Sequence, residues 1–242
     1  MRLLQHLPNG SFKLVSFADD AVPPYAILSH TWIDGEEVMY NELVAGIRMD
    51  KAGYEKIGFC AERAALDVLE YFWVDTYCID KSDGQELSTA INSMFRWYQR
   101  ANRCYVYLSD VSVPDNVVDA QAFPITWLDA IRRSRWFRRG WTLQELLAPA
   151  TVEFFSKERK YLGSKMTLEQ EIHQITQIPN GALRGQSLAN FGIEQRINWA
   201  TTRTTKRKED KVYCLLGVFE VFLPLIYGEG GSKRHSAAPR GN

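Results

Sequence analysis

The chain has 242 residues, 45% of them apolar and 24% charged, which is the composition of a globular protein with its own core and excludes a disordered or collagen-like chain. Its 29 basic and 29 acidic side chains give a formal net charge of zero, so no overall charge attracts the protein to nucleic acid or to an acidic membrane. No apolar run of about 18 residues and no signal-peptide pattern occurs, and we therefore expect a cytoplasmic protein without a membrane segment.

The two ends of the chain differ from the middle. Residues 1–23 are expected to form an irregular leader, which ends at Pro23 and Pro24. The main domain is expected over residues 24–230. Residues 231–242 are small, basic and polar and can bury little surface, so they are expected to form a disordered tail.

The first half of the main domain alternates strands and helices. Three short apolar runs predict buried strands, at Tyr25–Leu28, Tyr71–Val74 and Cys104–Leu108. Apolar residues at helical spacing predict a helix over 57–69, and a second one over about 83–101 that starts at a capping box formed by Ser82 and Gln85. This alternation predicts an α/β fold, with an open, mainly parallel sheet flanked by helices and a loop over 75–83.

The second half is expected to be more helical. A polar loop with two prolines spans 112–124, and a basic helical stretch then runs from Ile125 to a stop at Pro149. A fourth strand is expected at Val152–Phe155. Further helices are predicted over 167–175 behind a capping box at Thr167, over 193–200, and over 209–216 with Gly217 as the residue that ends it.

The cysteines and histidines show no metal-ligand spacing. The four cysteines (Cys60, Cys78, Cys104 and Cys214) form no C-x-x-C pair, and no two of the four histidines are close in the sequence. We therefore expect reduced, mostly buried thiols, no metal site and no cofactor.

Polar side chains follow each of the first three predicted strands. Because ligands bind beyond the carboxyl ends of parallel strands, these side chains are candidate binding residues: Ser29, His30, Trp32, Asp75, Asp80 and Ser109. Serine and aspartate also cap helices, and a lone histidine is often structural, so a purely structural interpretation stays open for each of them. The glycine-rich phosphate loops and the G-x-S-x-G elbow are absent, which argues against ordinary Rossmann dehydrogenases, P-loop NTPases and serine hydrolases.

Several blocks, in order along the chain, resemble the fungal heterokaryon-incompatibility (HET) domain. They are Tyr25–Trp32, Trp73–Lys81, Ala90–Phe95, Ser134–Leu146, Glu209–Gly217 and Pro224–Gly230. Two features depart from that pattern: Tyr77 stands where the family usually has a second cysteine, and no helix is expected after Gly230, as in a truncated chain. The resemblance implies a cell-death effector of self/non-self recognition that self-associates and often accompanies nucleotide-binding oligomerisation and repeat modules in a longer protein.

A more distant similarity to Toll/interleukin receptor (TIR) domains bears on mechanism. The first strand ends in Leu28-Ser29, and the block Trp141–Leu146 has the spacing Trp-x-x-x-Glu-Leu. In enzymatic TIR domains the glutamate of this block lies in the active site that cleaves NAD at the nicotinamide–ribose bond, and Glu145 occupies the matching position. The similarity implies a TIR-like sheet, a catalytic Glu145 and NAD as substrate.

The basic stretch around Arg135 and Arg138 supports more than one interpretation. In an NAD-cleaving enzyme these arginines are candidates to pair with the pyrophosphate, while Trp32 or Trp141 stacks on a base. The alternative is a non-enzymatic oligomerisation and signalling module that uses the same arginines to recruit partners. Binding of RNA or DNA is a third interpretation, which the balanced net charge disfavours. Glu145 itself could instead be a solvated residue or an arginine partner on a helix.

Overall fold

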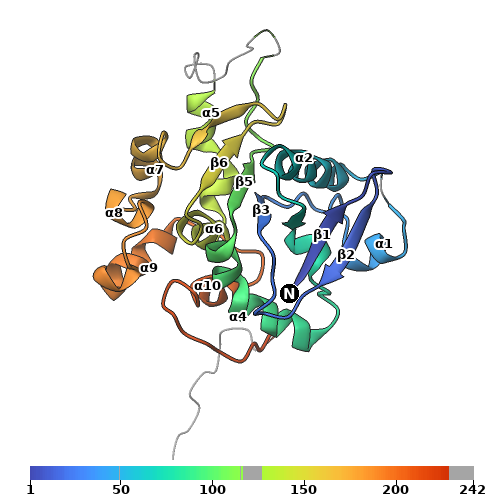
Figure 1. Cartoon of the computed structure of the whole chain (residues 1–242). Coiled ribbons are helices and arrows are strands. Elements are labelled where there is room, and N and C mark those ends of the chain that lie inside the picture. Colours follow the sequence, from blue (N-terminus) through green and yellow to red (C-terminus); the bar gives the residue numbers. More distant parts are fainter. Residues whose placement is uncertain (49, 115, 117–126, 229–242) are drawn as a thin grey trace, which may run out of the picture.

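A seven-stranded sheet organises the computed structural model, which describes residues 1–48, 50–114, 116 and 127–228 (Figure 1). The strands are β1 (Arg2–His6), β2 (Phe12–Ser16), β3 (Tyr25–His30), β4 (Tyr71–Trp73), β5 (Arg103–Tyr107), β6 (Val152–Phe155) and β7 (Tyr161–Ser164). Their order across the sheet is β2-β1-β4-β3-β5-β6-β7. The four strands expected from the apolar runs are confirmed.

The four central strands are parallel. β3 pairs with β4 on one side and with β5 on the other, and β6 follows β5. Numbered along the chain, these strands lie in the order 2-1-3-4, which is the order of flavodoxin-like sheets. In such sheets the winding reverses between the first and third strands, here β3 and β5, and leaves a crevice at their carboxyl ends.

The amino-terminal residues form a hairpin at the sheet edge, so the expected irregular leader is wrong for residues 1–16. β1 pairs antiparallel with β2 and with β4, and Leu3 and Leu4 are fully buried. The chain turns through Asn9-Gly10, where Gly10 has a φ of 81°, a conformation that glycine adopts without strain. The two adjacent leucines and the Asn-Gly turn are the local signals that predict a hairpin.

The helices cover both faces of the sheet. They are α1 (Tyr40–Val44), α2 (Ala52–Leu66), α3 (Asp75–Cys78), α4 (Gly84–Arg100), α5 (Leu128–Arg133), α6 (Thr142–Leu147), α7 (Glu169–Thr176), α8 (Asn180–Leu183), α9 (Ile193–Thr201), α10 (Asp210–Tyr213) and the short 3-10 helices η2 (Arg135–Arg138) and η3 (Leu188–Asn190). The ring of Phe59 on α2 packs against Tyr105, whereas the neighbouring Cys104 donates to the backbone of Glu145 on α6. Because successive side chains on a strand point to opposite faces, α2 and α6 lie on opposite sides of β5.

The polar end of α4 and the segment before it differ from the sequence expectation. The cap of α4 is Asp83 rather than Ser82, since the Asp83 carboxylate accepts from the backbone N–H groups of Gln85 and Glu86. The expected loop after β4 begins with the short helix α3.

Three expectations for the second half need correction. The basic stretch before Pro149 is not one helix but α5, η2 and α6 in succession. Thr167 does not cap α7, because its hydroxyl accepts from the backbone N–H of Ser164, and the helix starts at Glu169. Gly217 does not end a long helix in the left-handed conformation: α10 has a single turn, and a Cβ at Gly217 would collide with Phe95, so close packing explains the glycine.

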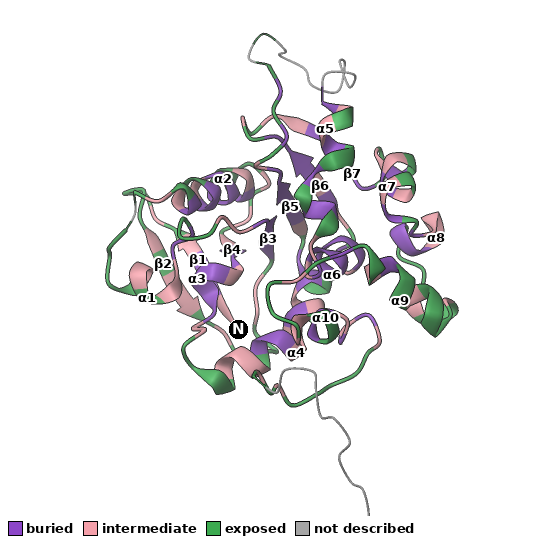
Figure 2. Cartoon of the chain, turned by 180° about the vertical axis from the view of Figure 1, so that it is seen from behind, coloured by how far each residue is buried: buried purple, intermediate pink, exposed green. Residues whose placement is uncertain are grey.

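The buried core lies along the central strands (Figure 2). Helices α7, α8 and α9 lie at the edge opposite the hairpin, and α9 buries mainly Trp199 (Figure 1). Part of the expected loop (residues 115 and 117–124), the start of the basic stretch at Ile125 and the expected tail at 231–242 lie outside the described residues. None of the described helices combines the length and apolar character needed to cross a membrane.

Candidate functional site

A cavity of about 250 Å³ opens at the carboxyl ends of β3 and β4. It shares the carboxyl end of β3 with the crevice that the sheet order predicts between β3 and β5. Its wall combines the exit of β3, helices α3, α4 and α6, and the segment from Thr204 to Tyr227. The residues that matter most for its chemistry are His30, Trp32, Asp75, Arg139, Glu145 and Arg207.

Glu145 supplies the buried carboxyl group of the cavity. It lies in α6 and accepts a hydrogen bond from the hydroxyl of Ser29, the buried residue that precedes His30 in β3. Trp136 Nε1 donates to the same Ser29 oxygen at 2.8 Å and so fixes the hydroxyl. Burial raises the pKa of Glu145 to about 8, and Asp75 adds to the rise, while the Ser29 hydrogen bond and Arg139 oppose it. At neutral pH this carboxyl is therefore mostly protonated.

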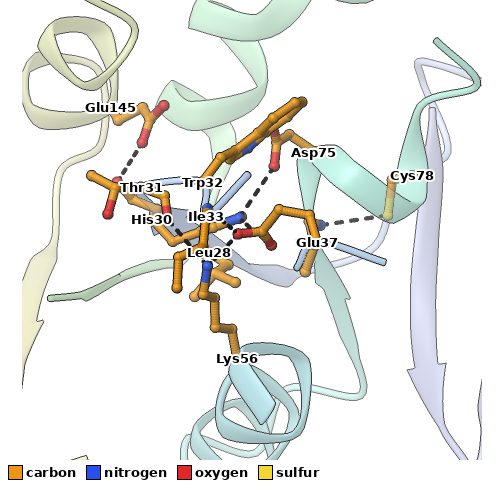
Figure 3. Close-up of polar contacts among 12 residues, drawn as sticks. Leu28, His30, Thr31, Trp32, Ile33, Glu37, Lys56, Asp75, Cys78 and Glu145 are labelled. Atoms are coloured by element: carbon orange, nitrogen blue, oxygen red, sulfur yellow. Dashed lines mark hydrogen bonds and ion pairs between the residues drawn. The ribbon is translucent and has the colours of Figure 1, made fainter. Parts of the chain in front are cut away.

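A network of buried charges lies beside this carboxyl (Figure 3). His30 Nε2 is 3.4 Å from Glu37 Oε2 and 3.9 Å from Asp75 Oδ1. Lys56 pairs with the other oxygen of Glu37 and also donates to the Thr31 carbonyl at 3.1 Å. Burial alone would raise the pKa of Glu37, but His30 and Lys56 outweigh it and lower that pKa to about 2.

Asp75 connects this network to the aromatic wall. Trp32 Nε1 donates to Asp75 Oδ2 at 3.0 Å, and Lys81 Nζ lies 3.5 Å from the same oxygen. The Lys81 ammonium is also 3.9 Å from the centre of the Trp32 ring. Burial lowers the pKa of Lys81, and Asp75 opposes that change. We call the set His30, Glu37, Lys56, Asp75 and Lys81 the ionic floor.

The mouth of the cavity, defined by Arg139, Lys206, Arg207, Asp210 and Tyr227, comes largely from the carboxyl-terminal segment. The guanidinium of Arg207 lies 4.5 Å from the centre of the Tyr227 ring, and the Tyr227 hydroxyl donates to Asp210 at 2.9 Å. Lys206 pairs with Asp34 across the exposed surface.

Backbone contacts hold this segment against the rest of the protein. Thr204 N–H donates to the Arg138 carbonyl at 2.6 Å, and Gly140 N–H donates to the Thr204 carbonyl at 2.9 Å. Further along, the side-chain amide of Asn92 on α4 donates to the Leu223 carbonyl at 3.0 Å and accepts from the Leu223 N–H at 3.1 Å. The segment therefore follows a defined path over the cavity.

The structure brings some of the sequence-derived candidates together. His30, Trp32, Asp75, Trp141 and Glu145 line the cavity, and Ser29 lies directly behind Glu145. Glu37, Lys56 and Arg207 were not expected in the site, and Arg139 was expected only as a member of the basic stretch that could bind phosphates. Glu37, Lys56 and Arg207 lie in no strand end and no recurring apolar pattern, so no local signal marks these three residues.

Four other candidates lie away from the cavity. Asp80 accepts from the backbone of Ser82 at 2.9 Å and shapes a turn. Ser109 is not part of the cavity wall, and its hydroxyl has no hydrogen-bond partner among the described residues. Arg135 is exposed, 3.6 Å from Asp110, and Arg138 lines a separate cavity of about 380 Å³. Because η2 turns more tightly than an α-helix, it is the following residue, Arg139, that reaches the Glu145 cavity.

The chemistry available at the site comes from acid, base and aromatic side chains. In the described part of the chain no group of three or more histidine, cysteine, aspartate or glutamate side chains could hold a metal ion. All four cysteines are unpaired and buried, as expected from their spacing. Burial raises the pKa of each thiol, so none is a ready nucleophile.

Comparison with known proteins gives two matches. Residues 25–123 match the family model described as "Heterokaryon incompatibility protein (HET)". The chain is also 51% identical over 235 residues to the vegetative incompatibility protein HET-E-1 of Podospora anserina, an alignment that covers 96% of this chain and 17% of that protein. The chain thus spans about a sixth of the length of this relative. No solved structure matches the chain.

Proposed function

The chain carries a domain of the heterokaryon-incompatibility (HET) family, and from this premise we propose that it is a cell-death effector of fungal vegetative incompatibility that hydrolyses NAD when copies cluster. In this proposal the domain works in the cytoplasm, self-associates, and splits the bond between nicotinamide and ribose. The relative is a vegetative incompatibility protein by name, and it is much longer than this chain, which leaves room there for modules that bring copies together.

The observation that carries the proposal is the buried carboxyl of Glu145 facing a cavity. When the glycosidic C–N bond of NAD breaks, nicotinamide leaves as a neutral molecule with the bonding electrons. The ribose becomes an oxocarbenium-like cation, a water oxygen bonds to its C1′ atom, and one proton is released. An ionised carboxylate next to that carbon stabilises the cation in a site of low dielectric constant.

The raised pKa of Glu145 suits a cationic substrate. With a pKa of about 8, the carboxyl holds its proton at pH 7. A positively charged nicotinamide ring entering the cavity lowers that pKa, because an opposite charge favours the ionised form. Substrate binding therefore produces the carboxylate that the bond cleavage requires, and the hydrogen bond from Ser29 holds it in place.

The shape of the cavity also supports a nucleotide. Trp32 and Trp141 give it flat aromatic walls on which a nicotinamide or adenine ring can stack. Its volume of about 250 Å³ is slightly below the range of roughly 300–1,000 Å³ that is usual for ligand pockets. One end of a dinucleotide would fill it while the other extends along the mouth.

Release of nicotinamide tests the proposal. Purified protein, clustered through a fused oligomeric tag, is incubated with NAD, and nicotinamide is followed by chromatography. The wild-type protein should release it, and Glu145→Gln should lower the rate about 100-fold or more. Glu194→Gln is the matched control, because this exposed glutamate on α9 is outside the cavity.

Two results would contradict hydrolysis. One is intact NAD in a mixture where a TIR hydrolase remains active. The other is undiminished cell death in a fungal strain that expresses the Glu145→Gln protein. The second result would favour the non-enzymatic oligomerisation and signalling module instead.

A further inference from the structure

Two guanidinium groups at the cavity, those of Arg139 and Arg207, form no ion pair with any residue that the structure describes. Arg139 and Arg207 both line it, and within the described residues neither side chain has an ion pair or a hydrogen-bond acceptor. The other cations there are engaged, since Lys81 pairs with Asp75 and Lys206 pairs with Asp34. A guanidinium beside a cavity with unused N–H groups is a donor set for an anionic ligand.

The position of Arg207 is fixed without using its donors. Its guanidinium lies over the face of Tyr227, and the Tyr227 hydroxyl is held by Asp210. This cation–π contact supplies no hydrogen-bond acceptor, so the N–H groups of the guanidinium keep their capacity to bind an anion. Five donors in a rigid plane match the oxygens of a phosphate better than the single ammonium of a lysine does.

Charge is distributed unevenly through the cavity. The carboxyl groups of Glu145 and Asp75 lie at the inner end near β3, and the exposed cation Arg207 lies at the mouth. Arg139, which belongs to the mouth, also acts on the inner end, because its positive charge lowers the pKa of Glu145. A ligand that is positive at one end and carries phosphates further along would meet the opposite charge at each step.

We propose that Arg139 and Arg207 bind the diphosphate of a nucleotide, so that its sugar enters the cavity toward Glu145 while its phosphates lie at the mouth. This proposal rests on the proposed function for the direction in which the substrate enters. It gives the phosphate-binding role to these two residues in place of Arg135 and Arg138, which lie outside the cavity.

Calorimetric titration with ligands that cannot be hydrolysed at a nicotinamide bond tests the assignment. The probes are ADP-ribose, ADP and adenosine. ADP and ADP-ribose should bind at least about tenfold more tightly than adenosine, because only the two phosphate-containing ligands can accept charge-assisted hydrogen bonds from the arginines. Arg139→Gln and Arg207→Gln should each weaken ADP binding about tenfold and leave adenosine binding unchanged.

Arg135→Gln is the matched control, since it removes an exposed guanidinium from the neighbouring helix outside the cavity. If Arg139→Gln folds poorly, Arg207→Gln still tests the assignment, because Arg207 is exposed and belongs to another segment. Equal binding of ADP and adenosine, or wild-type ADP affinity in Arg207→Gln, would overturn the assignment. ADP binding that depends on both arginines, combined with intact NAD in the hydrolysis assay, would support this site and refute the hydrolase.

Discussion

The ionic floor and the mouth of the cavity differ in how their charged side chains are paired. On the floor, Glu37 and Lys56 are almost completely buried and each satisfies the other. At the mouth, Arg207 is exposed and has no ion pair within the described residues. A buried charge without a partner destabilises the folded state, whereas an exposed charge is hydrated and can remain unpaired until a ligand binds. Substitutions on the floor should therefore affect stability, and substitutions at the mouth should affect binding.

The largest effect on stability is expected from Lys56→Met. This change leaves the carboxylate of Glu37 buried without its ammonium partner, which costs about 3–5 kcal/mol of unfolding free energy. Urea unfolding monitored by tryptophan fluorescence measures the loss. Lys206→Met is the counterpart at the mouth and should cost at most about 1 kcal/mol, because its pair with Asp34 is exposed. Equal losses in the two variants would refute the contrast between floor and mouth.

An effect that depends on pH is expected from Glu145→Gln. Its carboxyl has a pKa of about 8 in the folded protein against an ordinary value of 4.5, so the folded state keeps a proton that the unfolded state has lost. The wild-type protein therefore loses stability as pH rises from about 4.5 to about 8, by at most about 1.4 kcal/mol per pH unit. Glu145→Gln lacks this contribution.

Unfolding curves of both proteins at pH 5, 6.5 and 8 check the sign. The stability of Glu145→Gln relative to the wild type should increase with pH. Parallel pH profiles would mean that the carboxyl is solvated and would remove the basis for its catalytic role.

Ser29→Ala should destabilise the protein by about 1–3 kcal/mol, because both Trp136 Nε1 and the Glu145 carboxyl lose a buried partner. The Ser29 hydrogen bond lowers the pKa of Glu145, so its removal should raise that pKa and shift the alkaline rise of NAD hydrolysis to higher pH. The pH dependence of nicotinamide release measures the shift. An unchanged pH profile in a folded Ser29→Ala protein would show that the two residues are not coupled.

The smallest stability effect is expected from Arg207→Gln, within about 0.5 kcal/mol of the wild type, as is usual for exposed positions. The same variant should raise the KM for NAD about tenfold, because the lost donors bind phosphate in the ground state as well as in the transition state. Thermal unfolding and initial-rate kinetics on one protein sample give both values. A clear loss of stability with an unchanged KM would mean that Arg207 stabilises the fold and does not bind the ligand.

Local sequence patterns predicted the scaffold and the inner end of the cavity well. The apolar runs gave the parallel strands, and the strand ends pointed to His30, Trp32 and Asp75. Glu145 was expected in the site because its block is similar to that of TIR domains, not because of periodicity. These features are readable because each depends on residues close together in the chain.

The parts that sequence reasoning missed depend on contacts between distant segments. Glu37 is buried only because Lys56 and His30 approach it from other elements. Arg139 replaces Arg138 at the cavity because a tight 3-10 turn changes the phase of the side chains. The amino-terminal hairpin is a different case, since its Asn9-Gly10 turn was a local signal that could have been used.

The two hydrogen bonds between Asn92 and Leu223 are made to the backbone of Leu223 and do not involve its side chain. The path of this segment therefore depends on Asn92 of α4, a residue more than a hundred positions earlier in the chain. Any amino acid with a backbone N–H at position 223 can form the same two hydrogen bonds. Proline is the exception, because it has no N–H to give.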